Sequence, residues 1–141
     1  MMECLILGDS IAVGTHQYKQ ECISISRGGI NSFQWTKEFL NRPALDMQDY
    51  KNVIISLGSN DHSGVKTLAE LEKIRSAIKA NKVFWIMPHG NLNPNLLSKI
   101  QDNILSIARK NGDAIIYIKD IQKDGIHPTA AGYKRIVSEV K

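Results

Sequence analysis

The chain has 141 residues, which is the length of about one globular domain. Its content of 43% hydrophobic and 23% charged residues excludes a disordered, fibrous or repeat-built chain. The net charge of +4 comes from cations that are spread along the sequence without a dense basic run, so we expect no nucleic-acid partner. We expect one domain that spans residues 1–141.

Five short segments rich in Ile, Val and Leu are predicted to be strands. In chain order they cover residues 3–7, 22–26, 53–57, 83–87 and 114–118. Most of them are nearly continuous apolar runs, which is typical of strands that are covered on both faces of a parallel sheet.

Apolar residues at three- and four-residue steps predict amphipathic helices between these strands. Three such patterns begin at Leu68, Leu97 and Tyr133, a shorter helix is predicted over residues 32–40, and a helix over residues 11–20 is left open. Strands that alternate with helices imply right-handed crossovers onto a parallel sheet. The predicted fold class is therefore α/β, a flavodoxin-like three-layer α/β/α sandwich around a five-stranded parallel sheet.

Cys4 and Cys22 lie in apolar segments without CxxC spacing or a neighbouring histidine, so we expect reduced, buried thiols. A disulfide is conceivable if their segments are neighbouring strands. No apolar run approaches the roughly 18 residues that a membrane span needs, and the N-terminus lacks the pattern of a signal peptide. We therefore expect a cytoplasmic protein without a membrane span, and export by another route stays open.

Polar clusters follow four of the five predicted strands. They are Gly8-Asp9-Ser10, Arg27-Gly28-Gly29, Gly58-Ser59-Asn60-Asp61 and Asp124-Gly125-Ile126-His127-Pro128. In open parallel sheets, ligands bind at the carboxyl ends of the strands. We therefore expect all four clusters on the same edge of the sheet, where a functional site would lie.

This series of motifs resembles the SGNH (GDSL-type) hydrolase family. The family's four motif residues are a Ser, a Gly, an Asn and a His, here Ser10, Gly29, Asn60 and His127. The resemblance runs from residue 8 to about residue 133, and residues 124–129 are its most specific part. It implies the SGNH hydrolase fold and substrates such as acetylated carbohydrates, lysophospholipids, thioesters or simple short-chain esters.

The residues themselves support the chemistry of a serine hydrolase. A serine hydroxyl is a poor nucleophile until a base takes its proton, and histidine is the side chain suited to that task near neutral pH. Ser10 is therefore predicted to be the nucleophile and His127 the base. Asp124, three positions before His127, is predicted to orient the imidazole and to stabilise its protonated form.

Acyl transfer also needs hydrogen-bond donors for the developing oxyanion. The resemblance assigns this role to the backbone N–H groups of Ser10 and Gly29 and to the side-chain amide of Asn60, with Gly28 as the alternative to Gly29. Asp9 and Asp61 are expected to brace their loops. The candidate substrate contacts are Arg27, His62, His89 and Asn91.

Short connections after Ser10 and after Ile118 leave little room for a lid, so an open, shallow cleft is predicted. The expected function is hydrolysis of short-chain esters, acetyl above all, on a small-molecule or glycan carrier. We expect no metal and no cofactor, because the sequence has no metal-ligand spacing and no nucleotide-binding glycine motif. The alternatives are a non-catalytic SGNH-like module that binds a glycan or a partner, and a lysophospholipase or thioesterase.

Overall fold

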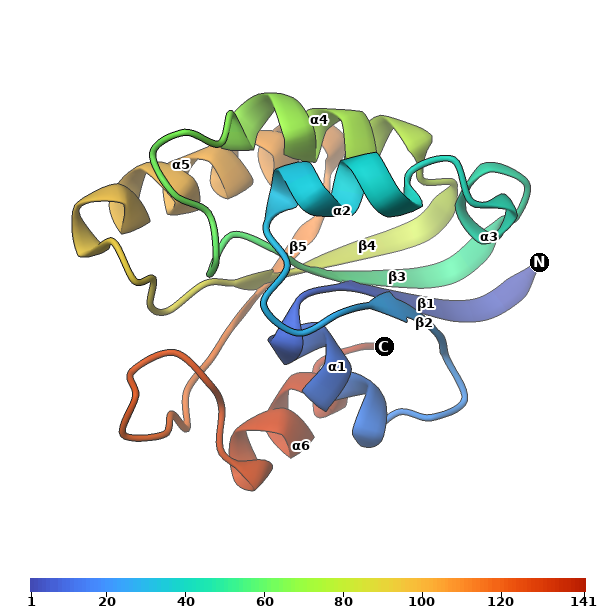
Figure 1. Cartoon of the computed structure of the whole chain (residues 1–141). Helices are drawn as coiled ribbons and strands as arrows, with labels where there is room; N and C mark the ends of the chain where they lie inside the picture. The colour runs from blue at the N-terminus through green and yellow to red at the C-terminus, as the bar shows by residue number, and fades with distance from the viewer.

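The computed structural model describes residues 1–141 and contains one five-stranded parallel sheet. The strands are β1 (Met2–Gly8), β2 (Ile23–Ser26), β3 (Tyr50–Ser56), β4 (Ala80–Met87) and β5 (Ala114–Tyr117), in the order β2-β1-β3-β4-β5 (Figure 1). All five predicted strands are confirmed. β3 and β4 begin earlier than predicted, because polar residues at their first positions, such as Lys51 and Asn81, interrupt the apolar pattern.

Helices cover both faces of the sheet, so the predicted three-layer sandwich is confirmed. One face carries α1 (Ser10–Gln17) and α6 (Ala130–Ser138), and the other carries α2 (Ser32–Phe39), α4 (Thr67–Ala77) and α5 (Pro94–Asn111) (Figure 1). The segment left open in the sequence, residues 11–20, is largely α1. The sequence does not predict α3 (Pro43–Asp46), because a single turn that begins at a proline has no helical periodicity.

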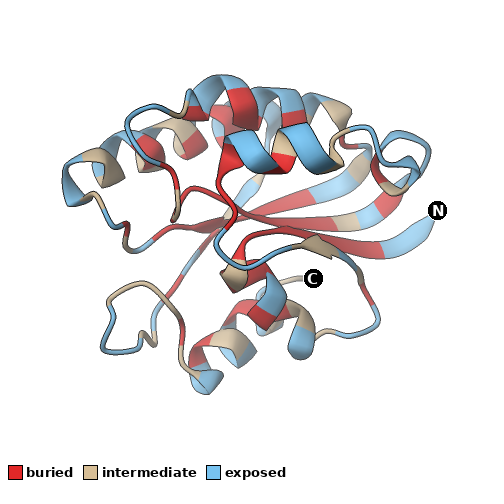
Figure 2. Cartoon of the chain, in the orientation of Figure 1, coloured by how far each residue is buried: buried red, intermediate tan, exposed pale blue.

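The sheet separates two hydrophobic clusters, and the three central strands, β1, β3 and β4, are buried over most of their length (Figure 2). Neighbouring residues of a strand point to opposite faces, so Leu5 packs toward α2, α4 and α5 whereas Ile6 packs toward α1 and α6. Trp35 and Trp85 are fully buried in the first cluster.

The expectation of reduced thiols is wrong, because Cys4 and Cys22 form a disulfide. The parallel strands β1 and β2 pair with Leu5 opposite Ile23, which places the two cysteines side by side with their Cα atoms 4.7 Å apart. A disulfide can bridge this separation. Disulfides persist mainly in oxidising compartments, so this pair stands against the cytoplasmic location that the sequence suggests.

Reduction of this disulfide is expected to destabilise the fold. The bond closes a loop between residues 18 positions apart, and the chain-entropy model assigns about 3 kcal/mol of unfolding free energy to a loop of this size. Urea unfolding with and without a phosphine reductant measures the difference, and the Cys22→Ala variant serves as the control that the reductant should not affect. Equal midpoints for the oxidised and reduced wild-type protein would contradict the prediction.

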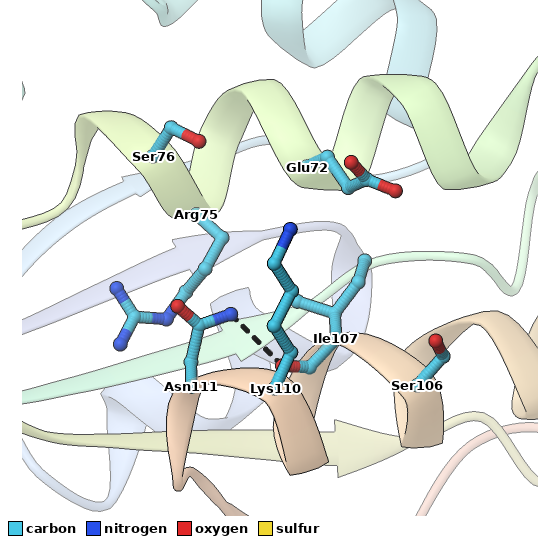
Figure 3. A pocket seen from close by; sticks show the side chains of 7 residues that line it. All are labelled: Glu72, Arg75, Ser76, Ser106, Ile107, Lys110 and Asn111. Carbon is cyan, nitrogen blue, oxygen red and sulfur yellow. Dashed lines mark hydrogen bonds between the residues drawn. The ribbon is translucent and has the colours of Figure 1, made fainter.

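Figure 3 shows a groove between α4 and α5, on the outside of the sandwich. Its lining comes from both helices: Glu72, Arg75, Ser76, Ser106, Ile107, Lys110 and Asn111. Arg75 reaches past it to an ion pair with Asp113, 2.8 Å away, and Trp85 donates to the same carboxylate. The groove contains no residue of the predicted site.

None of the helices combines the length and the apolar character that a membrane span requires.

Candidate active site

Two of the predicted site residues follow neighbouring strands in the middle of the sheet. Ser10 begins α1 directly after β1, and Asn60 lies in the loop after β3. The chain leaves β1 toward one face of the sheet and leaves β3 toward the other (Figure 1). Such a switch point opens a crevice at the carboxyl ends of the strands, which is where ligands bind in sheets of this type.

The structure brings the three predicted catalytic side chains into one chain of hydrogen bonds. The Ser10 Oγ atom lies 2.8 Å from Nε2 of His127, although 117 positions separate the two residues. The Nδ1 atom of His127 lies 2.6 Å from Oδ2 of Asp124. The arrangement can move a proton from the serine hydroxyl to the imidazole while the carboxylate holds the ring.

The Asp124 carboxylate is fixed by its own loop. Its Oδ1 atom accepts hydrogen bonds from the backbone N–H groups of Ile126, at 2.8 Å, and His127, at 2.9 Å. These backbone bonds, His127 first, together with the bond from the His127 side chain lower the pKa of Asp124 to about 2. An ionised carboxylate only accepts hydrogen bonds, so Nδ1 of His127 carries the proton and Nε2 is left to accept from the Ser10 hydroxyl.

Ser10 is held in place by Asp9, the residue before it. Asp9 is fully buried, and its Oδ1 atom accepts from the Ile11 backbone N–H and from the Ser56 hydroxyl, both at 3.0 Å. The first bond caps α1 and the second ties the cap to β3. The bracing role expected for Asp9 is thus visible in its contacts.

The free energy of unfolding should fall between about pH 4 and pH 7 because of Asp9. Burial raises the pKa of its carboxyl to about 7, and the hydrogen bond from Ser56 offsets this only in part. The unfolded chain releases this proton near pH 4, so within the window the folded state holds a proton that the unfolded state lacks, and rising pH favours unfolding.

The Asp9→Asn variant cannot ionise at this position, and it should lose this part of the pH dependence. Urea unfolding of the wild-type and variant proteins at pH 4.5 and pH 7 measures the two slopes. A variant whose stability changes with pH as much as that of the wild type would contradict the assignment.

The three groups that the sequence assigns to the oxyanion hole each keep a hydrogen to donate. The backbone N–H groups of Ser10 and Gly29 donate to no other backbone group. The Asn60 amide nitrogen donates one hydrogen to the Ile30 carbonyl at 3.1 Å and keeps a second. Gly29 has a φ of +78°, a conformation that favours glycine, and it lines a cavity of about 330 Å³ together with Asn60. Gly28 is not among the residues that line this cavity.

Two buried side chains anchor the loop that carries Asn60. The Asn91 amide nitrogen lies within 3.1 Å of three carbonyl oxygens of this loop, those of Gly58, Ser59 and Asp61. The Asp61 carboxylate accepts from the Ser32 backbone at 2.9 Å and from the Thr67 hydroxyl at 2.7 Å. Asp61 thus braces its loop as expected, and Asn91 anchors the same loop while it also lines the cavity.

The turn after β4 packs against two loops of the site, the one that carries Asn60 and the one that carries Asp124. His89 Nδ1 lies 3.0 Å from the Gly125 carbonyl oxygen. A Cβ atom on Gly90 would lie 2.4 Å from the same oxygen, so only glycine permits this close packing. Together with Asn91 this turn contacts both the loop of Asn60 and the loop of Asp124, a role that sequence reasoning missed.

Of the other candidate substrate contacts, His62 lines the 330 Å³ cavity and Arg27 does not. His62 is exposed and lines the cavity beside Asn60, and its Nδ1 atom accepts from the Gly64 N–H at 3.1 Å. Arg27 instead forms an ion pair with Glu38 at 2.5 Å and does not line this cavity.

Comparison with solved structures places this arrangement among known folds. No protein-family model matches the sequence, and neither does a curated protein. A lipase/acylhydrolase from Enterococcus faecalis superposes with a TM-score of 0.72 at 16% identity, covering 99% of this chain and 95% of that one. A GDSL-like lipase from Bacteroides thetaiotaomicron has a TM-score of 0.69 at 16% identity, over 97% and 84% of the two chains.

A further structural neighbour is the C-terminal catalytic domain of peptidoglycan O-acetyltransferase A from Streptococcus pneumoniae. Its TM-score is 0.68 at 14% identity, and the alignment covers 96% of this chain and 88% of that one. At these identities the likeness concerns the fold. The chain therefore has the α/β fold of the SGNH (GDSL-type) hydrolases.

Proposed function

We propose that the protein is a serine ester hydrolase of the SGNH family. The observation that carries this proposal is the continuous chain of hydrogen bonds from the Ser10 hydroxyl through His127 to the Asp124 carboxylate. Ser10 follows β1 at the switch point of the sheet, and the N–H groups of Ser10, Gly29 and Asn60 are the donors that we propose for the oxyanion. This combination supplies a nucleophile, a base, an orienting acid and electrostatic stabilisation in one crevice.

The reaction proceeds in two steps. Ser10 Oγ attacks the acyl carbonyl carbon while His127 Nε2 takes the hydroxyl proton, and the oxyanion accepts from the N–H groups of Ser10, Gly29 and Asn60. His127 then gives its proton to the alcohol oxygen, the ester C–O bond breaks, and the acyl group stays on Ser10. Water attacks this acyl-enzyme and gives its proton to His127, which returns it to Ser10 as the carboxylic acid leaves.

The acyl group is proposed to be acetyl. The cavity beside the oxyanion donors measures about 330 Å³, and Leu92 is the one apolar side chain among the residues that line it. A long acyl chain would gain little there, because its stabilisation depends on apolar surface that is removed from water. The fold neighbours include an acetyl xylan esterase from Geobacillus stearothermophilus, with a TM-score of 0.64.

A series of p-nitrophenyl esters tests this function. We expect kcat/KM to be highest for the acetate, lower for the butyrate and lowest for the octanoate, and we expect all three rates to depend on Ser10. The Ser10→Ala variant measures the hydrolysis that does not use the site. Rates that rise toward the octanoate would overturn the acetyl specificity, and rates equal to those of the variant would overturn the hydrolase itself.

A further inference from the structure

We propose that a second cavity, next to the oxyanion donors, binds a neutral pyranose ring of the carrier to which the ester is attached, an inference that rests on the proposed function. The loop over residues 62–66 and the first turns of α2 and α4 form this cavity, which measures about 520 Å³. Such a volume is typical of small-ligand sites. The residues that line it are Asn31, Phe33, His62, Gly64, Val65, Lys66 and Glu70.

His62 connects this cavity to the proposed reaction centre. Its side chain lines both the 520 Å³ cavity and the 330 Å³ cavity that contains Gly29 and Asn60. An acyl carbonyl held by the oxyanion donors would therefore leave the rest of its molecule within reach of His62 and the cavity beyond. We call this second cavity the carrier subsite.

Phe33 gives the carrier subsite an aromatic wall. It is the second residue of α2 and is 51% exposed, whereas Trp35 on the same helix is fully buried in the core. A half-exposed aromatic ring beside a cavity offers an apolar face on which a ligand can pack. The C–H face of a pyranose ring is apolar and can lie flat on such a ring, while its hydroxyl edge still needs polar partners.

The Glu70 carboxylate offers hydrogen-bond acceptors for the hydroxyl edge of a sugar, and it disfavours an acyl chain at the same place. Its side chain is buried, with 6% exposure, and its Oε1 atom has only a long ion pair of 3.4 Å, to Lys73. A carboxylate accepts hydrogen bonds from hydroxyl groups, but a hydrocarbon chain would remove its solvent without replacing the hydrogen bonds. Lys66 lines the same cavity, so one basic and one acidic residue border it, which favours a neutral ring over an anionic one.

A binding experiment tests the carrier subsite without relying on turnover. We would titrate the neutral disaccharides cellobiose, xylobiose and N,N′-diacetylchitobiose into the Ser10→Ala variant and follow backbone amide NMR signals. At least one sugar should give saturable shifts at Phe33 and residues 62–66, and an added Phe33→Ala substitution should abolish them. Met47→Ala is the matched control, because Met47 is 77% exposed and follows α3, at the opposite end of the sheet (Figure 1). Absence of shifts with all three sugars would overturn the inference.

Kinetics separate failure of this inference from failure of the proposed function. For each variant we would divide kcat/KM for a mono-O-acetylated methyl glucopyranoside by kcat/KM for p-nitrophenyl acetate. Phe33→Ala and Glu70→Gln should lower this ratio about tenfold, mainly by raising KM for the sugar ester. Phe33→Tyr and Met47→Ala should keep the wild-type ratio. An unchanged ratio in the first two variants, with hydrolysis still dependent on Ser10, would overturn the carrier subsite and leave the hydrolase standing. Without any Ser10-dependent hydrolysis the proposed function fails, and the sugar titration alone decides the inference.

Discussion

The Ser10→Ala variant should hydrolyse p-nitrophenyl acetate about 10⁴- to 10⁶-fold more slowly than the wild type in kcat, because the only hydroxyl within reach of His127 Nε2 is removed. His127→Ala should cause a loss of similar size. Nucleophile and base act as one unit, so the double variant should be no slower than either single variant. Steady-state kinetics at neutral pH measure all three rates.

Ser138→Ala provides the matched control for this series. Ser138 is exposed on α6, and its hydroxyl bonds only to the Arg135 carbonyl. This variant should keep the wild-type rate, and circular dichroism should show that all the variants are folded. Losses that multiply in the double variant would show that Ser10 and His127 act separately, contrary to the proposed mechanism.

Asp124→Asn should lower kcat by about 10⁴-fold, because it stabilises the imidazole tautomer that carries its proton on Nε2. Oδ1 of Asp124 accepts from two backbone N–H groups, those of Ile126 and His127. An asparagine would keep its carbonyl oxygen in that position and turn its NH₂ group toward Nδ1 of His127. The imidazole proton would then move to Nε2, and Ser10 would face a donor in place of a base.

Kinetics and ¹⁵N NMR of the His127 ring together check this second prediction. The ring should carry its proton on Nδ1 in the wild-type protein and on Nε2 in the Asn variant. Asp120→Asn is the matched control, because Asp120 pairs with Arg135 at 3.7 Å in the same loop region and should not affect the ring. A loss of less than about tenfold for Asp124→Asn would contradict the orienting role of Asp124.

The strands and the proposed catalytic residues could be predicted from the sequence for physical reasons. A strand that is covered on both faces must be apolar over most of its length, and the residues after parallel strands meet at one edge of the sheet. Ser10, Asn60 and His127 each follow such a strand or its loop, so the sequence predicts that they lie at the same edge of the sheet. Asp124 could be assigned because it precedes His127 within one turn.

Features that depend on which strands are neighbours could not be predicted. The pairing of Cys4 with Cys22 requires β2 at the edge next to β1, which the spacing of the cysteines does not reveal. The contacts of Asn91 required the loop after β4 to pack against the loop after β3. The one local signal was polar and glycine residues after β4, and it does not distinguish an anchor from a substrate contact.

Phe33 and Glu70 carried no such signal at all. In the sequence, Phe33 belongs to the apolar pattern of a helix and Glu70 to the charged residues of another helix. Their shared cavity appears only when α2 and α4 pack side by side.

Covalent labelling of Ser10 tests the central claim most directly. The purified protein would be treated with a fluorophosphonate, which reacts with an activated serine, and its peptides analysed by mass spectrometry. We expect one adduct per chain, on Ser10, and strongly reduced labelling in the His127→Ala variant. Ester hydrolysis that continues at its full rate after treatment, or an adduct on another residue that abolishes activity, would contradict Ser10 as the nucleophile.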